Sequence, residues 1–158
     1  MSSTPITANA VANSEAASRT GRTAALATYG FLILRVVVGI VFAMHGWQKL
    51  TVMGFGGVGG FFGMLGIPFP ELAAIVVTLV ELVGGIALIL GIGTRIAGAL
   101  LAADMLVAML LVHWPNGFFM DTNGIELTLT LAANALFFAL AGPGALSLDA
   151  QLWSKRKA

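Results

Sequence analysis

Three ionisable residues lie within otherwise apolar stretches of this chain: Arg35, Glu81 and Asp104. Arg35, for example, lies between Phe31-Leu-Ile-Leu and Val-Val-Val-Gly-Ile40. A charge at the centre of a bilayer costs from about 3 to more than 10 kcal/mol, depending on the method. Ionisable side chains in such surroundings either pair inside a helix bundle or take part in chemistry such as proton transfer. These three residues therefore indicate a polar centre, if their segments cross a membrane.

The composition places those segments in a membrane. Of 158 residues, 58% are hydrophobic and 9% are charged, and the mean hydropathy is +0.96, as in membrane proteins. Four apolar runs have the roughly 18–22 residues that a hydrocarbon core requires. They cover approximately Tyr29–Leu50, Glu71–Leu90, Arg95–Trp114 and Gly124–Ala141. We predict an all-α membrane protein, a four-transmembrane-helix bundle.

The segments outside the bundle set its orientation. Residues 1–27 are rich in Ser, Thr, Ala and Asn and are expected to form a disordered tail, followed by a membrane domain over 28–150 and a basic tail over 151–158. We do not expect a cleaved signal peptide, because the first apolar run is long enough to span. With the N-terminus inside, only Lys49 lies on the outer side. The inner side then holds Arg19, Arg22, Arg95, Lys155, Arg156 and Lys157. The positive-inside rule therefore predicts that both termini are cytoplasmic.

The glycine-rich segment 51–70 is too short for two further spans. We expect an interfacial or re-entrant element on the outer face, whose backbone is satisfied by protein or by headgroups. Its Gly54-Phe-Gly56-Gly-Val-Gly59 string matches a dinucleotide fingerprint. No soluble strand precedes it, so the match indicates no nucleotide site.

Depth counting suggests that the polar centre includes all four helices. At 1.5 Å per residue, Arg35 and Asn134 lie about 10 Å, and Glu81 and Asp104 about 14–15 Å, from the cytoplasmic ends of their spans. Arg35 could bridge the two carboxylates and simply lock the bundle. One arginine against two carboxylates, however, leaves one negative charge in excess. The alternative hypothesis is that Glu81 or Asp104 holds a proton at neutral pH and serves proton-coupled chemistry.

A second polar group is predicted at the outer end. His45 and Lys49 are four residues apart on one helix face, with Gln48 beside them. His113 closes the third span and Glu126 opens the fourth at the same level. These residues could merely cap helices at the interface. We favour a headgroup or ligand pocket, because His45 lies about one turn inside the interface.

The residue types argue against thiol, haem and metal chemistry. The chain has two histidines and no cysteine, so it cannot by itself form disulfides, a thiol relay or an iron–sulfur site. We do not expect haem, because both histidines lie near an interface and histidine is more often a hydrogen-bonding group. A metal site would lack a third ligand unless Glu126 joined it. The net charge of +1 indicates no nucleic-acid partner.

Small residues spaced four apart, Gly39 with Ala43 and Gly98 with Ala102, predict close helix packing. This packing could occur within the chain or between copies in a homo-oligomer.

Several motifs in order resemble those of the DoxX family of small four-helix bacterial membrane proteins, over residues 29–150. The matching pieces are Arg35 with Gly39, His45-Gly-Trp-Gln-Lys49-Leu, Gly66-Ile-Pro, Glu81-Leu-Val-Gly84-Gly85, Leu90-Gly91-Ile-Gly93-Thr94-Arg95, Gly124-Ile-Glu126 and Gly142-Pro-Gly144-x-x-Ser147-Leu-Asp149. The resemblance implies a multi-pass protein of the bacterial plasma membrane. Asp104 lies outside these motifs.

The resemblance also implies redox work. Relatives resemble subunits of thiosulfate:quinone oxidoreductase or membrane partners of soluble redox enzymes, whereas others in the wider superfamily act as cargo receptors or assembly chaperones. We therefore expect a quinone-interacting or membrane-anchoring subunit of a redox system, with quinone as the cofactor and a soluble or membrane redox protein as partner. The alternative is a non-enzymatic scaffold or assembly chaperone for a partner protein.

Overall fold

A computed structural model describes the backbone of residues 5–155 and the side chains of residues 17–155. All regular elements in this described part are helical. In chain order they are α1 (Pro5–Gln48), the π-helical η1 (Lys49–Met53), α2 (Gly54–Met64), α3 (Pro70–Leu90), α4 (Thr94–Ala108), the π-helical η2 (Met109–His113), the 3₁₀ turns η3 (Trp114–Asn116) and η4 (Met120–Thr122), α5 (Glu126–Ala141) and α6 (Leu148–Lys155).

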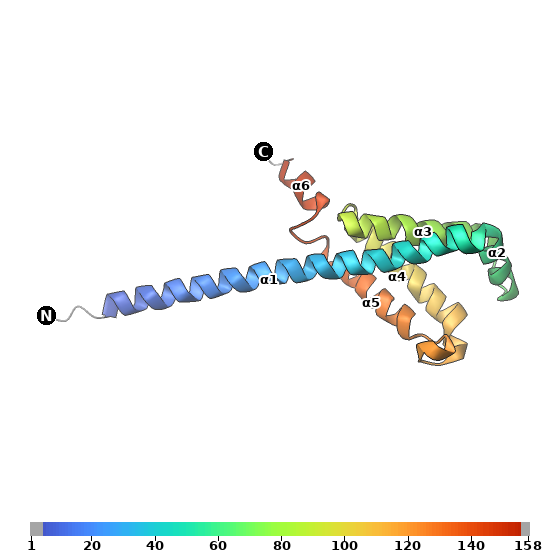
Figure 1. The fold of residues 1–158 in the computed structure, drawn as a ribbon, viewed down its shortest axis with the longest axis horizontal. Coiled ribbons are helices and arrows are strands. Elements are labelled where there is room, and N and C mark those ends of the chain that lie inside the picture. Colours follow the sequence, from blue (N-terminus) through green and yellow to red (C-terminus); the bar gives the residue numbers. More distant parts are fainter. Residues whose placement is uncertain (1–4, 156–158) are drawn as a thin grey trace.

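Four of these helices make the bundle that the sequence predicts. Three helical stretches are long and apolar enough to cross a membrane: Ala17–Met64, Pro70–Leu90 and Thr94–Asn116. A shorter apolar helix, Glu126–Ala141, completes the set. Figure 1 shows α3, α4 and α5 gathered around the second half of α1. The prediction of an all-α, four-helix membrane bundle is confirmed.

The bundle is assembled from two tightly packed helix pairs. On α1 and α3, a Cβ atom added to Gly46 would lie 2.4 Å from the Leu82 backbone nitrogen, and one on Gly85 would lie 2.4 Å from that of Ala43. On α4 and α5, a Cβ atom on Gly98 would lie 2.7 Å from the Ala139 nitrogen. Small residues thus let the backbones touch, as in membrane helix dimers. These glycines pack within the chain.

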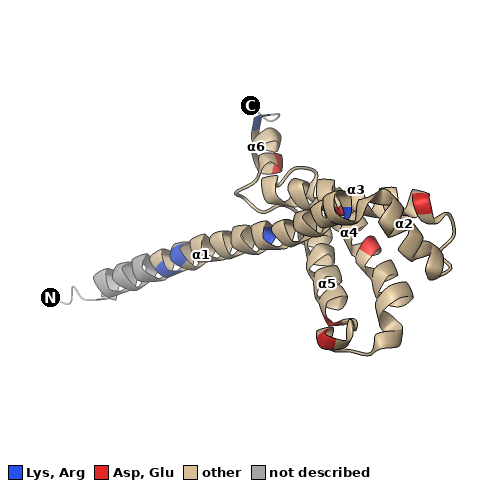
Figure 2. Cartoon of the chain, turned by 45° about the vertical axis from the view of Figure 1, so that its right-hand side comes forward, with Lys and Arg blue, Asp and Glu red and all other residues tan. Residues whose placement is uncertain are grey.

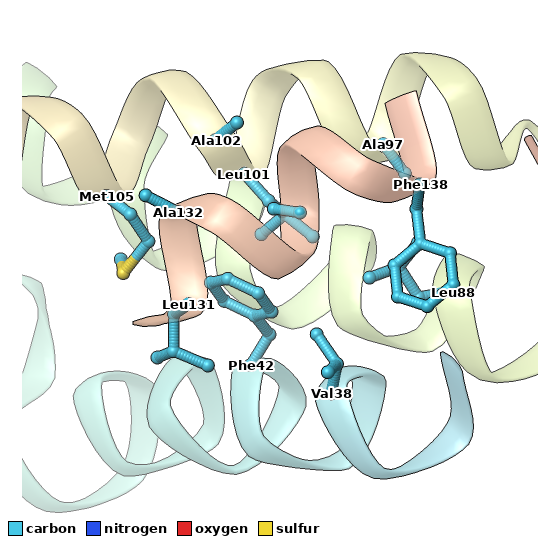
Figure 3. Close-up of a cluster of buried hydrophobic side chains, with 11 residues drawn as sticks. Val38, Phe42, Leu88, Ala97, Leu101, Ala102, Met105, Leu131, Ala132 and Phe138 are labelled. Atoms are coloured by element: carbon cyan, nitrogen blue, oxygen red, sulfur yellow. The ribbon is translucent and has the colours of Figure 1, made fainter. Parts of the chain in front are cut away.

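Larger apolar side chains join the two pairs. Phe42 of α1, Leu88 of α3, Leu101 of α4 and Phe138 of α5 are completely buried, and Figure 3 shows these side chains meeting between the helices. A separate cluster of Val58, Phe62 and Ala74 fastens α2 to the start of α3. The two clusters share no residue among those described, and residues of both line a cavity between them.

The N-terminal segment differs from the sequence-based expectation. Residues 17–27, predicted to be disordered, continue α1 as an exposed helix that extends beyond the bundle (Figure 1). Their alanine content favours helix, which an argument from overall polarity overlooks. Residues 1–4 of that predicted tail, and residues 156–158, lie outside the described residues.

The segment 51–70 forms η1 and α2, with a turn at Gly54, where φ is 67°. It packs on α3 through the α2 cluster, so its backbone is satisfied within the protein, as expected for such an element.

Candidate functional site

The charged residues of the bundle fall into two groups, and their wide spacing is visible in Figure 2. We call the end near Gly91, Gly93 and Asp149 the inner end, because the positive-inside rule predicts that it faces the cytoplasm. The opposite end, near Phe62 and His113, is the outer end.

Arg35 belongs to the inner end. Its guanidinium donates hydrogen bonds from Nη1 to the Pro143 carbonyl and from Nη2 to the Leu146 carbonyl, at 2.7 Å for the latter. Only 2% of the residue is exposed. Arg35 thus holds the segment between α5 and α6 and does not bridge Glu81 and Asp104.

This position corrects the depth count, and the helix register explains it. Gly39 of α1 packs beside Gly85 and Ile89, so Arg35, one turn further inward, lies level with the end of α3. A Cβ atom on Gly91 would lie 2.5 Å from Arg35 Nη1. The first apolar run begins several residues before the bundle does, and counting depth from Tyr29 therefore placed Arg35 too far into the membrane.

The other inner charges also bind backbone groups. Asp149 accepts hydrogen bonds from the Gly93 and Thr94 amides at 2.9 and 3.0 Å, and these amides open α4. A carboxylate is favourable there, since the first amides of a helix lack intrahelical partners. Arg95 Nη1 donates to the Ala139 and Leu140 carbonyls at 3.0 and 2.5 Å, near the end of α5. The inner charges therefore organise the chain connections.

The outer group contains an ion pair that the sequence analysis did not predict. Lys49 Nζ lies 2.5 Å from Glu81 Oε2, and 21% of the Lys49 side chain but only 4% of the Glu81 side chain is exposed. Lys49 is the first residue of η1, and Glu81 lies in the middle of α3. The packing of Gly46 on Leu82 brings the two together. The sequence did contain one indication that Lys49 belongs to the site: Lys49 is four residues from His45 and shares a helix face with it.

Asp104 of α4 faces the same space. Its Oδ2 atom is buried and has no hydrogen-bond partner among the described residues. Of the described residues that line this space, Lys49 is the single lysine or arginine, and Glu81 and Asp104 are the two carboxyl groups. The excess of carboxyl groups over cations inferred from the sequence therefore recurs at this site, with Lys49 in the place that Arg35 was expected to take.

These side chains line a cavity of about 380 Å³, which we call the outer cavity. Its volume is within the range of small-molecule sites. Most of its walls are apolar, and its polar lining residues are His45, Lys49, Glu81, Asp104, His113, Asn123 and Thr128. Asn123 and Thr128 were not predicted as site residues, because neither belongs to a charged or periodic pattern of the sequence.

The structure separates the predicted site residues into two sets. His45, Lys49 and His113 of the expected outer pocket line the outer cavity together with Glu81 and Asp104 of the expected polar centre. His113 Nδ1 also lies 2.9 Å from the Asn123 carbonyl. One cavity therefore combines parts of two predicted groups.

Three other predicted residues do not line the outer cavity. Gln48 is exposed on the outside of α1. The exposed Glu126 accepts a hydrogen bond from the Met120 amide at 3.0 Å. Asn134 donates to the Thr130 carbonyl of its own helix at 2.8 Å. Among the described residues, no three His, Asp or Glu side chains are grouped closely enough to hold a metal ion.

Comparisons with known proteins agree with this architecture. The family model described as DoxX matches residues 30–114. The chain is 34% identical over 128 residues to a Bacillus subtilis protein named "Putative oxidoreductase CatD", covering 81% of this chain and 90% of that one. No solved structure matches the chain.

Two Escherichia coli relatives bear names that state a location. Inner membrane protein YphA is 34% identical, over 75% of this chain and 86% of its own length. Inner membrane protein YqjF is 31% identical, over 80% and 94%. These relatives and the spanning helices make this a multi-pass bacterial membrane protein, and the chain belongs to the DoxX family.

Proposed function

We propose that this protein is the membrane subunit of a redox system and that its outer cavity binds a quinone headgroup. One observation carries the proposal: an apolar cavity among spanning helices has the Lys49–Glu81 pair and the unpartnered Asp104 carboxyl in its wall. An ionisable group at that depth is costly, which favours a functional role. The relative from Bacillus subtilis named as an oxidoreductase supports a redox setting.

The lining fits the chemistry of a quinone ring. The two carbonyl oxygens of a quinone accept hydrogen bonds, and the ammonium of Lys49 has three donors, of which Glu81 takes one. His45 and His113 offer further ring nitrogens. The side chains of Phe42 and Phe62 supply apolar aromatic walls on which the ring would lie.

The excess carboxyl fits the proton requirement. Reduction of a quinone to a quinol takes up two electrons and two protons. Asp104 would hold a proton in this cavity and release it to a quinone oxygen nearby. The two electrons and the second proton would come from a reduced partner redox protein, so the chain would supply the binding site and one of the two protons.

Binding of a quinone to the purified protein in lipid nanodiscs tests this proposal. We expect saturable binding of a ubiquinone or menaquinone analogue, together with co-purified quinone in mass spectra of the gently extracted protein. The Asp104→Asn variant should bind the quinone at least about tenfold more weakly, a loss of about 1.4 kcal/mol. Asp121→Asn is the matched control, because Asp121 is exposed and does not line the outer cavity. A wild-type protein that binds no quinone would refute the proposal.

A second candidate function, a scaffold for a partner protein, is favoured by the exposed extension of α1. Residues 17–27 protrude from the bundle and carry Arg19 and Arg22 (Figure 1). If this surface holds a partner, Arg19→Ala/Arg22→Ala should release one stoichiometric protein from the purified complex, whereas Asp104→Asn should retain it. If instead the partner stayed bound to Arg19→Ala/Arg22→Ala and was lost from Asp104→Asn, the cavity and not the α1 extension would be the functional site.

A further inference from the structure

An ordered turn covers the outer cavity at the outer end. The segment between η2 and α5 contributes Met120, Asn123 and Gly124 to the cavity wall, and both Met120 and Asn123 are also exposed on the outside of the turn. Backbone hydrogen bonds fix this segment, from the Gly124 amide to the Phe119 carbonyl at 2.9 Å and from the Ile125 amide to the Gly117 carbonyl at 3.0 Å. A ligand that entered here would have to break an ordered turn.

The cavity is also closed towards the inner end. Phe42, Met105 and Leu131 line it and belong to the core that joins the two helix pairs. Phe42 is completely buried, and Met105 and Leu131 are 5% and 7% exposed. Reaching the cavity from this side would require opening the best-packed part of the molecule.

The third side, between α2 and the outer part of α4 with η2, is open. Phe61 of α2, Val107 of α4 and Leu111 of η2 all line the cavity, yet they are 36%, 53% and 49% exposed. A side chain that is exposed and also lines a cavity lies at its rim, and here the rim is made of side chains from two separate helical stretches rather than of a hydrogen-bonded turn. Val107 and Leu111 are apolar and lie in a stretch long enough to span the membrane. Phe61 is an apolar side chain of the element expected at the outer interface, so this rim faces the lipid of the outer leaflet.

We propose that the outer cavity is loaded sideways from the outer leaflet, through the opening bounded by Phe61, Val107 and Leu111. Its ligand is an amphiphile whose polar head reaches Lys49, Glu81 and Asp104 while a long apolar tail remains in the opening. The proposal rests on the proposed function and specifies a tailed, membrane-dissolved quinone.

The distribution of polarity supports this direction. The ion pair and Asp104 line the same cavity as the apolar rim, so a ligand that enters through the rim meets apolar groups first. A volume of about 380 Å³ lies near the lower end of small-molecule sites. It suits a ring-sized head, and a long tail would extend through the rim into the bilayer.

A cross-link across the opening tests the route. The chain has no cysteine, so Phe61→Cys/Leu111→Cys introduces the only two thiols, which a short bis-maleimide can join. In nanodiscs, we expect the cross-linked protein to load a long-tailed quinone at least about tenfold more slowly than the unlinked protein. Each single-cysteine variant treated with the same reagent is the control. Equal loading before and after cross-linking would overturn the proposal.

A second measurement tests the opening without any quinone. Dicyclohexylcarbodiimide dissolves in lipid and attaches to buried carboxyl groups, which mass spectrometry detects. We expect it to label Asp104 in the unlinked protein, to label it at least severalfold less after cross-linking, and not to label that position in Asp104→Asn. A water-soluble carbodiimide should reach the exposed Glu126 instead.

The two measurements separate the two proposals. Asp104 that stays unlabelled, or is labelled equally after cross-linking, would overturn the lateral opening whatever the protein binds. Labelling that the cross-link suppresses, in a protein that binds no quinone, would support the opening and refute only the quinone function.

Discussion

The inner and outer ends of this bundle use the same types of charged residue in opposite ways. At the inner end, Arg35, Arg95 and Asp149 each bind backbone groups of the chain connections. At the outer end, Lys49, Glu81 and Asp104 surround a cavity, and one carboxyl oxygen there has no partner among the described residues. A charged residue in a family motif therefore does not by itself indicate a functional site.

The difference follows from where each charge lies along its helices. The ends of helices leave amides and carbonyls without intrahelical partners, and Arg95 and Asp149 bind such groups. Arg35 binds carbonyls of the connection between α5 and α6, which lie outside any helix. Glu81 and Asp104 lie within α3 and α4, where the backbone groups are already bonded to one another. Their side chains can pair only with another side chain, as Glu81 does with Lys49, or with a ligand.

Replacing Arg35 should lower the stability more than any of the other substitutions. If it did not, the contrast between a structural inner end and a ligand-binding outer end would not hold. Arg35→Met removes both donors from the Pro143 and Leu146 carbonyls. At about 1.5–3 kcal/mol for each hydrogen bond to a charged group, we expect the free energy of unfolding to fall by about 3 kcal/mol. Titration with denaturing detergent, followed by circular dichroism, measures this change.

Arg35→Lys provides the control for charge alone. Lysine retains the positive charge but lacks the planar fork that reaches two carbonyls at once, so it should restore only part of the stability. A stable Arg35→Met variant with altered quinone binding would show instead that Arg35 serves the ligand.

Two glycines with the same backbone conformation offer a smaller and sharper comparison within the inner end. Gly91 and Gly93 are both left-handed, with φ values of 69° and 55° and ψ values of 43° and 29°. A Cβ atom on Gly91 would meet Arg35, whereas one on Gly93 would meet nothing within 4 Å. Alanine at either position should cost about 1 kcal/mol in backbone strain.

Gly91→Ala should cost about 1–2 kcal/mol more than Gly93→Ala, because the guanidinium must also move. Thermal denaturation of the two variants in the same detergent compares them directly. Equal losses would indicate that the inner end is not packed tightly around Arg35.

The sequence predicted the architecture well, because span length, glycine turns and apolar composition are local properties. Five of the seven polar residues that line the outer cavity were among the predicted site residues, since His45 and Lys49 share a helix face, His113 ends a span on the same side, and Glu81 and Asp104 lie within apolar runs. The prediction failed on Arg35 and on the partner of Glu81. The register of α1 against α3 is set by Gly39, Gly46 and Gly85 packing on specific backbone atoms. Hydropathy does not encode that register. Counting from the ends of apolar runs therefore predicted Arg35 too far towards the outer end and predicted Lys49 at the interface.

The smallest expected effect on stability is at Asp104, and it separates the two ends most clearly. Asp104→Asn keeps the shape of the side chain and removes a carboxyl that has no partner among the described residues, so the free energy of unfolding should change by less than about 1 kcal/mol. Asp149→Asn is its counterpart at the inner end. It weakens the bonds to the Gly93 and Thr94 amides and should cost about 1 kcal/mol, as loss of a helix cap does.

Quinone binding should show the opposite pattern. Its affinity should fall in Asp104→Asn and stay unchanged in Asp149→Asn. If Asp104→Asn destabilised the protein as much as Asp149→Asn and left binding intact, Asp104 would be a structural residue like those of the inner end.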